Sequence, residues 1–375
     1  MSKKLFYRGF FYQKKDMARF LAEDHDFDIL YRDASPPVKR QTKFFFVKHA
    51  IFDVLFLLKR LRQIRRYDYI LALWHAAPAF MLLKRFGLIH YEKMLWFGFS
   101  VHSSFWGKLY RLIAKLDKKN TWFVVFTEQE IENYARRLGI PPSRLLFIPH
   151  GDWPQPIQIP DVFAPDPDLD LSTPFYFAGG FTNRNYAPVI ETFRKLGHRL
   201  IIVCSSTNTD VVDAELPANI SVYRDITFEN FELLLAASKA VIIPLRYDAG
   251  AAGHSVLVRS MRNGKIVIAN DFRIIDDYIE NDVDGVLVAD LEGALQKAIT
   301  DIEADGASYE RIREAARQRF ARDYSQDAME RMMSDLIEGR PIRSRSARRR
   351  QEPEGIVSSE TAPEPPTAGR TAALR

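Results

Sequence analysis

The sequence predicts an α/β protein of two domains, each built on a parallel sheet wrapped by helices. Its 375 residues exceed what one hydrophobic core usually serves, so two domains are expected. Short apolar runs alternate with stretches of helical spacing along most of the chain, which is typical of parallel sheets with helical crossovers. A segment rich in proline and aspartate interrupts this alternation, and the same pattern then begins again.

The first domain is predicted to span residues 1–155. Its strands are expected at the apolar runs of residues 4–7, 28–31, 69–74, 93–100 and 122–127. It closes at Phe147-Ile148-Pro149-His150-Gly151-Asp152, and a linker is expected over residues 156–173 because proline and aspartate dominate there.

The second domain is predicted over residues 174–338. Its strands are expected at residues 174–178, 199–204, 220–223, 240–244, 266–269 and 285–288. Residues 308–337 have helical spacing and many charges, so we expect a helix that crosses back over the first domain. Residues 339–375 hold a basic run and a tail rich in Pro, Ala and Thr, and we expect them to be disordered.

Composition narrows the classes of function. Lys and Arg exceed Asp and Glu by only five, which is not the bulk charge of a nucleic-acid-binding protein. The single cysteine, Cys204, excludes a disulfide framework, and no cluster of His, Asp and Glu has metal-ligand spacing. The N-terminus lacks the apolar core of a secretory signal, and residues 44–58 are too short to span a bilayer. We therefore expect a cytoplasmic protein that requires no metal.

Two glycine-rich turns follow predicted strands of the second domain and suit phosphate binding. The first contains Gly179, Gly180 and Arg184, where small residues let a ligand approach the backbone and an arginine can pair with phosphate oxygens. The second contains Gly253, His254 and Ser255 at a predicted helix N-terminus, where free amides bind anions. The alternatives are a tight turn with a solvated arginine and a serine that only caps a helix.

Four stretches of the second domain, residues 178–184, 244–255, 260–271 and 277–288, together resemble the donor domain of GT-B glycosyltransferases, especially family 4. Residues 126–151 resemble the end of that family's first domain. The resemblance implies two Rossmann-like domains that face a cleft. It also implies transfer of a hexose from a nucleoside-diphosphate sugar to a saccharide or lipid-linked acceptor, in bacterial surface polysaccharide or glycolipid synthesis, without a cofactor.

The sequence departs from this family at two glutamates that hold the donor sugar and ribose. The matching positions are Ala251 and Arg259, neither of which can accept a hydroxyl proton. Arg259 could instead contact a phosphate or an acidic sugar, or be a surface residue. The departure motivates an alternative, a catalytically silent GT-B scaffold that binds a partner transferase or a membrane. A nucleotide-sugar epimerase shares the architecture and is a further alternative.

Three histidines are candidates on the acceptor side. His102 follows a predicted strand, as the family's active-site histidine does, and the resemblance makes it the favoured catalytic residue. In an inverting enzyme it could be the general base, because the unperturbed pKa of histidine lies near working pH. In a retaining enzyme it would instead contact the donor sugar or position the acceptor. His75 is its rival and His150 belongs to the hinge, while a structural histidine is the alternative for each.

Between residues 44 and 66, large apolar side chains are interleaved with Lys and Arg. Such a segment could rest on the anionic inner face of a membrane, which would make the protein peripheral. Core-facing helices of an α/β domain show a similar pattern, so the sequence leaves both interpretations open.

Overall fold

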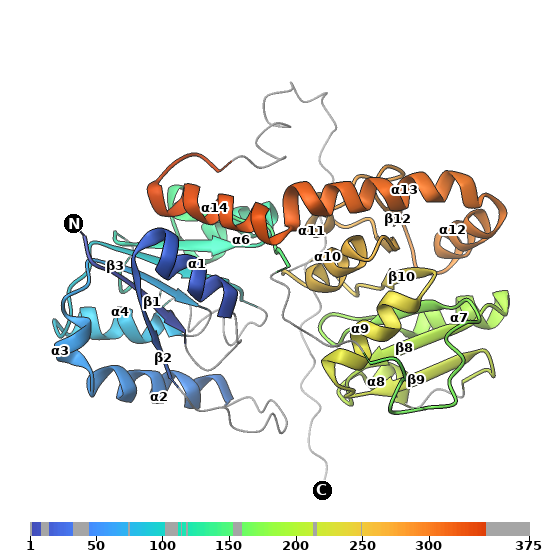
Figure 1. Cartoon of the computed structure of the whole chain (residues 1–375), viewed down its shortest axis with the longest axis horizontal. Coiled ribbons are helices and arrows are strands. Elements are labelled where there is room, and N and C mark those ends of the chain that lie inside the picture. Colours follow the sequence, from blue (N-terminus) through green and yellow to red (C-terminus); the bar gives the residue numbers. More distant parts are fainter. Residues whose placement is uncertain are drawn as a thin grey trace, which may run out of the picture.

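The computed structural model describes residues 2–8, 15–32, 45–73, 76–101, 112–113, 115–117, 119–152, 160–212, 216–248 and 250–342. In these residues the chain forms two six-stranded parallel sheets, one in each half of the sequence, with helices on both faces of each sheet (Figure 1). This arrangement confirms the predicted pair of α/β units.

The first sheet has the strand order β2-β1-β3-β4-β5-β6. Its strands are β1 Lys4–Arg8, β2 Phe27–Tyr31, β3 Tyr69–Leu73, β4 Lys93–Phe97, β5 Thr121–Val125 and β6 Leu145–Phe147. Its helices are α1 Lys15–His25, α2 Phe45–Leu58, α3 Leu61–Ile64, α4 Ala77–Arg85, α6 Glu128–Leu138 and the 3₁₀ turn η2 Pro142–Arg144. Among the described strands, β6 alone was not predicted, because an edge strand of three residues is too short to show a clear apolar pattern.

The second sheet has the order β12-β11-β10-β7-β8-β9, which is the Rossmann order. Its strands are β7 Tyr176–Gly179, β8 Leu200–Cys204, β9 Ile220–Arg224, β10 Ala240–Ile243, β11 Ile266–Asn270 and β12 Val286–Val288. The helices that follow are α7 Ala187–Leu196, α8 Thr209–Val212, α9 Phe228–Ala237, α10 His254–Arg262, α11 Arg273–Asp276, α12 Gly293–Ala304 and α13 Gly306–Arg319. The last elements are the π-helical turn η3 Phe320–Tyr324 and α14 Gln326–Glu338.

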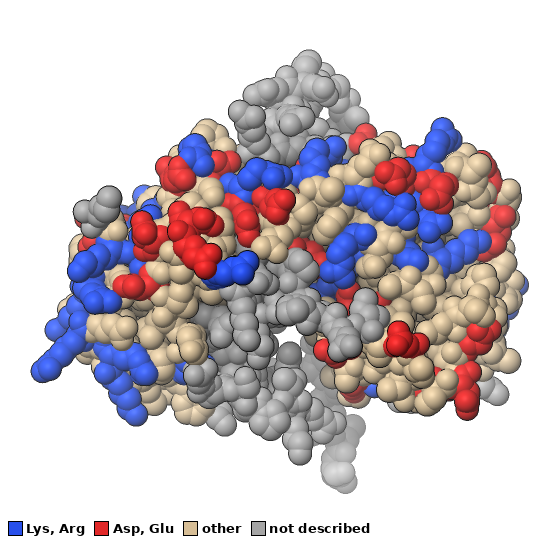
Figure 2. Space-filling model, in the orientation of Figure 1, with Lys and Arg blue, Asp and Glu red and all other residues tan. Residues whose placement is uncertain are grey.

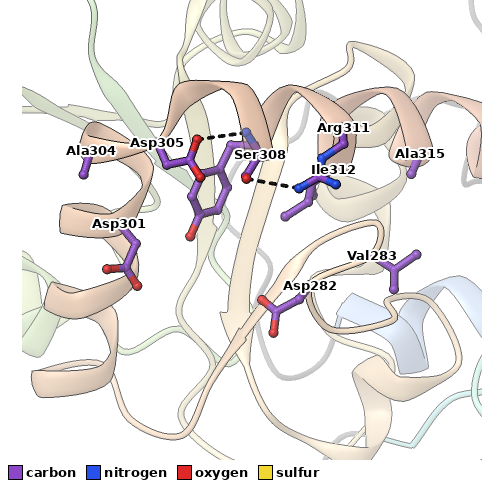
Figure 3. Close-up of a pocket in the computed structure, with 10 residues that line it drawn as sticks. Asp282, Val283, Asp301, Ala304, Asp305, Ser308, Arg311, Ile312 and Ala315 are labelled. Atoms are coloured by element: carbon purple, nitrogen blue, oxygen red, sulfur yellow. Dashed lines mark hydrogen bonds between the residues drawn. The ribbon is translucent and has the colours of Figure 1, made fainter.

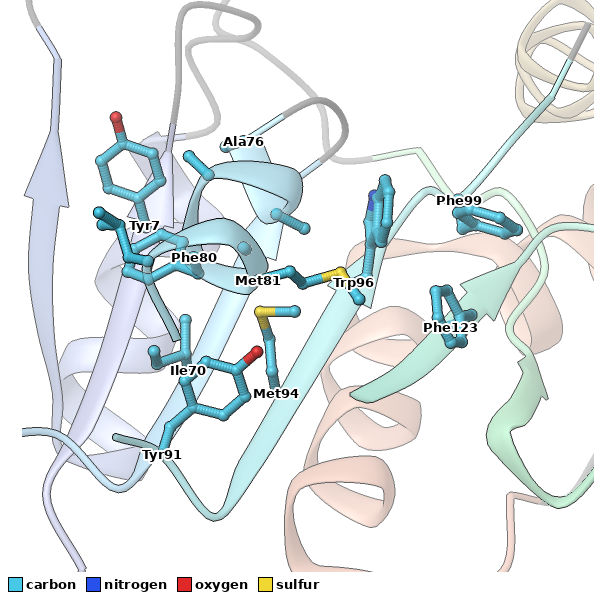
Figure 4. Packing of buried hydrophobic residues seen from close by; sticks show 14 of the residues in the cluster. Tyr7, Ile70, Ala76, Phe80, Met81, Tyr91, Met94, Trp96, Phe99 and Phe123 are labelled. Atoms are coloured by element: carbon cyan, nitrogen blue, oxygen red, sulfur yellow. The ribbon is translucent and has the colours of Figure 1, made fainter. Parts of the chain in front are cut away.

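Central strands such as β3, β8, β10 and β11 are buried on both faces, which explains why they are apolar without alternation. In β4, Met94 and Trp96 join a core beneath α2 and α4 (Figure 4), whereas Leu95 and Phe97 join a second core on the opposite face. Successive side chains of a strand point to opposite faces, so a strand with two cores needs apolar residues at every position.

The C-terminal helix α14 leaves the second half and packs on the first (Figure 1). Its Met329, Met333 and Leu336 lie in one core with Phe6 of β1 and Leu95 of β4. This contact confirms the predicted crossing-back helix. The predicted disordered tail lies outside the described residues from position 343 onward.

The chain passes between the two halves twice, and the two passages lie against each other. The Asp152 N–H donates to the Tyr324 carbonyl at 2.9 Å. Gly151 faces the Met329 side chain so closely that an added Cβ would overlap the Met329 Sδ and Cγ atoms. A larger residue at position 151 would therefore force the Met329 side chain to move.

We predict that Gly151→Ala lowers the free energy of unfolding by about 1–3 kcal/mol, the usual cost of overpacking. Denaturant unfolding measures this change. A Gly151→Ala, Met329→Ala double variant is the control, because removing the overlapping side chain makes the two costs less than additive. Strict additivity would contradict the proposed steric overlap.

Candidate functional site

The two glycine-rich turns leave neighbouring strands at the point where the order of the second sheet reverses. Strands β7 and β10 pair in parallel, with Ala178 opposite Ile242, so their carboxyl ends meet at one edge. The chain then proceeds toward β8 on one side and toward β11 on the other. Ligands of open α/β sheets bind at this kind of switch point, which makes the edge our candidate site.

Arg184 occupies the centre of this edge and is only 4% exposed. Its Nε donates to the Gly179 carbonyl at 3.1 Å and its Nη1 donates to the Thr182 carbonyl at 2.7 Å. Burial lowers the pKa of the guanidinium. In the described part of the chain, no carboxylate lies within ion-pair distance of Arg184. The Tyr186 side chain also interacts with the guanidinium. A buried cation held by carbonyl and hydroxyl groups is electrostatically suited to receive an anion.

Glycines bring the backbone close to this guanidinium. Gly180 has φ 119°, and a Cβ there would lie 2.5 Å from Arg184 Nη2. Gly253 has φ 89° as the N-cap of α10, and its Cβ position lies 3.7 Å from Arg184 Nη1. The first amides of α10 thus adjoin the guanidinium, and helix N-terminal amides bind anions.

The His254 ring points away from this edge into the core. Its Nε2–H donates to the Ile274 carbonyl at 2.7 Å, and the ring lies 4.4 Å from the Tyr278 ring centre. Burial lowers the pKa of His254 to about 4, so the ring is neutral at physiological pH. What His254 presents at the start of α10 is its backbone N–H, followed by the half-buried Ser255.

Arg259 lies in a cluster of two half-buried arginines and two buried carboxylates. Its Nε is 3.4 Å from Glu232 Oε1 and 4.0 Å from Asp152 Oδ1, while Arg262 contacts both carboxylates. The Arg259 guanidinium also lies over the Phe228 ring, 4.4 Å from its centre. Arg259 is therefore not a free surface residue, and it ties α9 and α10 to the segment that follows β6.

The carboxyl edges of the two sheets face each other. Tyr278 lies after β11, and its hydroxyl donates a hydrogen bond of 2.7 Å to the carbonyl of Phe126, directly after β5. The Glu128 N–H donates to Asp277 Oδ2 at 2.8 Å, and Ala251 packs against the core of the first half. The second glycine-rich turn thus lies next to the strand ends of the first sheet.

Two of the three candidate histidines, His75 and His102, lie outside the described residues. They follow β3 and β4 in sequence, and the last residues of these strands, Leu73 and Phe97, are register partners. His150 is described, and its backbone N–H donates to Tyr278 OH at 2.6 Å while its ring contacts Phe126. His150 therefore lies at the chain crossing, and its role as a hinge stays a prediction.

Glu130 was not among the residues singled out from the sequence. It accepts hydrogen bonds from the Phe126 N–H at 3.0 Å and from Tyr134 OH at 2.7 Å. The same Tyr134 hydroxyl accepts from the Val101 N–H at 2.9 Å, directly before His102. Burial raises the pKa of Glu130 to about 7. The available sequence signal was the capping pattern Thr127-x-x-Glu130.

A separate hollow of about 660 Å³ lies beside α12 and α13 (Figure 3). Its lining includes Asp282, Asp301, Asp305 and Arg311. Asp282 precedes β12, so the hollow lies at the amino edge of the sheet, opposite to the edge where such sheets bind ligands. Among the described side chains, no group of three His, Cys, Asp or Glu residues is placed to hold a metal ion.

Comparison with known proteins identifies the architecture. Residues 208–319 match the family model described as glycosyl transferases group 1. No curated protein matches the sequence.

Solved structures of glycosyltransferases share the arrangement over 90% of this chain. Sucrose-phosphate synthase from Thermosynechococcus elongatus superposes with a TM-score of 0.68 at 16% identity and is covered over 99% of its length. Anabaena HepE, solved with UDP-glucose, gives 0.65 at 14% identity, and WaaG, a glycosyltransferase involved in lipopolysaccharide biosynthesis, gives 0.58 at 17%. Both of these chains are covered over their full length. The fold is GT-B, as the sequence resemblance implied.

We predict that Glu130 makes folding stability depend on pH. Above its unfolded pKa of 4.5 the carboxyl loses its proton in the unfolded chain but keeps it in the folded chain up to about pH 7. Between these values the wild type should lose about 3 kcal/mol of unfolding free energy relative to Glu130→Gln. Denaturant unfolding across this range measures it. The exposed Glu132→Gln is the matched control, and a pH-independent difference between wild type and Glu130→Gln would contradict the prediction.

Proposed function

We propose that this protein is a glycosyltransferase that moves a hexose from a nucleoside-diphosphate sugar to a saccharide or lipid-linked acceptor. The observation that carries the proposal is the buried Arg184 guanidinium beside the α10 N-terminus. The group 1 family match over residues 208–319 covers α10 and most of the second sheet, and therefore supports the same assignment.

In this proposal the donor diphosphate binds between the two glycine-rich turns. The Arg184 guanidinium and the amides of Gly253, His254 and Ser255 would stabilise the negative charge that develops when the bond from the anomeric carbon to phosphate breaks. Gly179 and Gly180 would let the diphosphate approach. These groups supply positive charge without a metal, so we propose that none is required. UDP is the first nucleotide to test, because the similar structure of HepE was solved with UDP and with UDP-glucose.

The acceptor would bind on the first half, where His102 is the proposed catalytic residue. It would take the proton from the acceptor hydroxyl if the anomeric configuration inverts, or contact the donor sugar if the configuration is retained. Glu130 and Tyr134 hold the backbone at Val101 and would position the segment that carries His102. His75 is the rival and His150 a hinge. We place the reaction in the cytoplasm, in surface polysaccharide or glycolipid synthesis.

A catalytically silent scaffold is the second candidate. The observation that favours it is the pairing of Arg259 with Glu232 and Asp152, which gives Arg259 a structural role at a position where the family has a sugar-binding glutamate. Nucleotide binding without turnover would support the scaffold, and isomerised nucleotide sugar as the product would support an epimerase.

We predict that UDP raises the melting temperature of the wild type but not of Arg184→Ala. At a nucleotide concentration 100 times its Kd, binding stabilises the folded state by about 2.7 kcal/mol. Arg194→Ala, which removes an exposed arginine paired with Glu191 on α7, is the matched control and should keep the shift. Calorimetric titration provides a direct check. If none of UDP, GDP, ADP and CMP raises the melting temperature of the wild type, the proposed donor site is wrong.

We predict that His102→Ala lowers kcat by about 10²–10⁴-fold while leaving the UDP-induced thermal shift intact, because loss of a general base affects only the transfer step. The readout is sugar transfer from radiolabelled UDP-glucose to a panel of saccharide and lipid-linked acceptors. The exposed His90 offers a control, His90→Ala, that should retain full activity. Full activity of His102→Ala would contradict the proposal and leave His75 as the candidate catalytic residue.

A further inference from the structure

Helix α2 exposes a stripe of large apolar side chains on the outside of the first half. Ile51, Leu55 and Leu58 are 53%, 49% and 36% exposed, and their spacing places them on one face of the helix. Phe52 beside them is 40% exposed. The opposite side of α2 is buried through Asp53 and Leu57, so the helix is firmly seated while the side chains of its outer stripe are exposed.

Basic residues continue this stripe beyond the end of α2. Lys59, Arg62 and Arg65 are exposed, and no acidic residue occurs between positions 54 and 67. In the described part of the chain, none of these three has a carboxylate within ion-pair distance. Figure 2 shows Lys and Arg gathered at this corner, over α2 and α3. We call Ile51, Phe52, Leu55, Leu58, Lys59, Arg62 and Arg65 the α2–α3 face.

The end of α4 extends the same surface. Arg65 Nε donates to the Leu88 carbonyl at 2.6 Å, which places the turn after α4 beside α3. That turn carries Phe86, which is 74% exposed, next to the exposed Arg85. Phe86 and Arg85 thus repeat, where α4 ends beside α3, the combination of an exposed apolar side chain and a basic one.

We propose that the α2–α3 face docks on the surface of an anionic lipid bilayer. Exposed apolar side chains next to Lys and Arg that have no carboxylate neighbour among the described residues are suited to shallow insertion among anionic headgroups. A second copy of this chain fits less well, because a twofold contact would bring the basic residues of both copies together. No helix of the described residues is long and apolar enough to cross a bilayer, so α2 would lie flat on the surface.

The buried side of α2 connects this surface to the strand ends of the first sheet. Asp53 accepts hydrogen bonds from Tyr7 OH in β1 at 2.8 Å and from Arg32 Nε, just after β2, at 2.9 Å. The docking helix is therefore anchored at the carboxyl edge that faces the second half. Docking does not require the proposed transferase activity, so the two proposals are tested separately.

The experiment is co-sedimentation of the full chain with vesicles of phosphatidylcholine alone and of equimolar phosphatidylcholine and phosphatidylglycerol. We expect binding only to the anionic vesicles and weaker binding at high salt. In the variant Lys59→Gln, Arg62→Gln, Arg65→Gln, partitioning should weaken about a hundredfold, because each basic residue near such a surface contributes roughly fivefold. The variant Ile51→Ser, Leu55→Ser, Leu58→Ser should also release the protein.

The matched control is Arg136→Gln, Arg137→Gln, Lys195→Gln, which removes three exposed charges elsewhere and should bind like the wild type. All variants keep the basic segment after position 339, so any contribution of that segment to vesicle binding is the same in each of them. Circular dichroism and the melting temperature establish that each variant is folded. Equal loss in the control and the face variant would overturn the proposal. So would a wild-type dimer that dissociates in the apolar variant, because the face would then bind a second copy.

Discussion

The relative position of the two halves depends on the side chain of Tyr278. Its hydroxyl donates to the Phe126 carbonyl of the first half and accepts from the His150 N–H at the chain crossing. Its ring stacks on Tyr324 at 5.5 Å and contacts His254 at the start of α10. One buried residue thus contacts the first half, the chain crossing and the start of α10. A buried hydroxyl with both partners in place is costly to displace.

This arrangement explains the unusual environments of the site residues. His254 is buried against the Tyr278 ring, and burial lowers the pKa of its side chain to about 4. In the proposed site, anion binding at the α10 N-terminus would therefore rest on its amides and on Arg184. Among the described residues Arg184 has no carboxylate within ion-pair distance, and carbonyls of its own loop hold its guanidinium. In the proposed function, a diphosphate would supply the negative charge that this buried cation lacks.

The proposed transferase site and the α2–α3 face share one scaffold, the first sheet. Asp53 ties the docking helix to the carboxyl edge of that sheet, and Tyr134 with Glu130 holds the backbone before His102 at the same edge. If both proposals hold, a lipid-linked acceptor would reach the strand ends from a bilayer held at a fixed orientation. The first sheet is packed against a core on each face, so the docking helix and the strand ends cannot shift independently of each other.

The sequence by itself determined the two α/β units, nearly all strands, the glycine-rich turns and the return of the last helix. These features depend on apolar patterning, on glycine conformation and on local capping, which neighbouring residues encode. Only the tertiary structure decided that the His254 ring turns into the core, that Arg259 pairs with Glu232 and Asp152, and that Glu130 is buried beside Val101. It also decided that the outer side of α2 is exposed, where the sequence left membrane and core open. These outcomes depend on partners more than 15 residues away in the sequence, or on burial that the packing of distant elements creates, and neither can be obtained from local pattern.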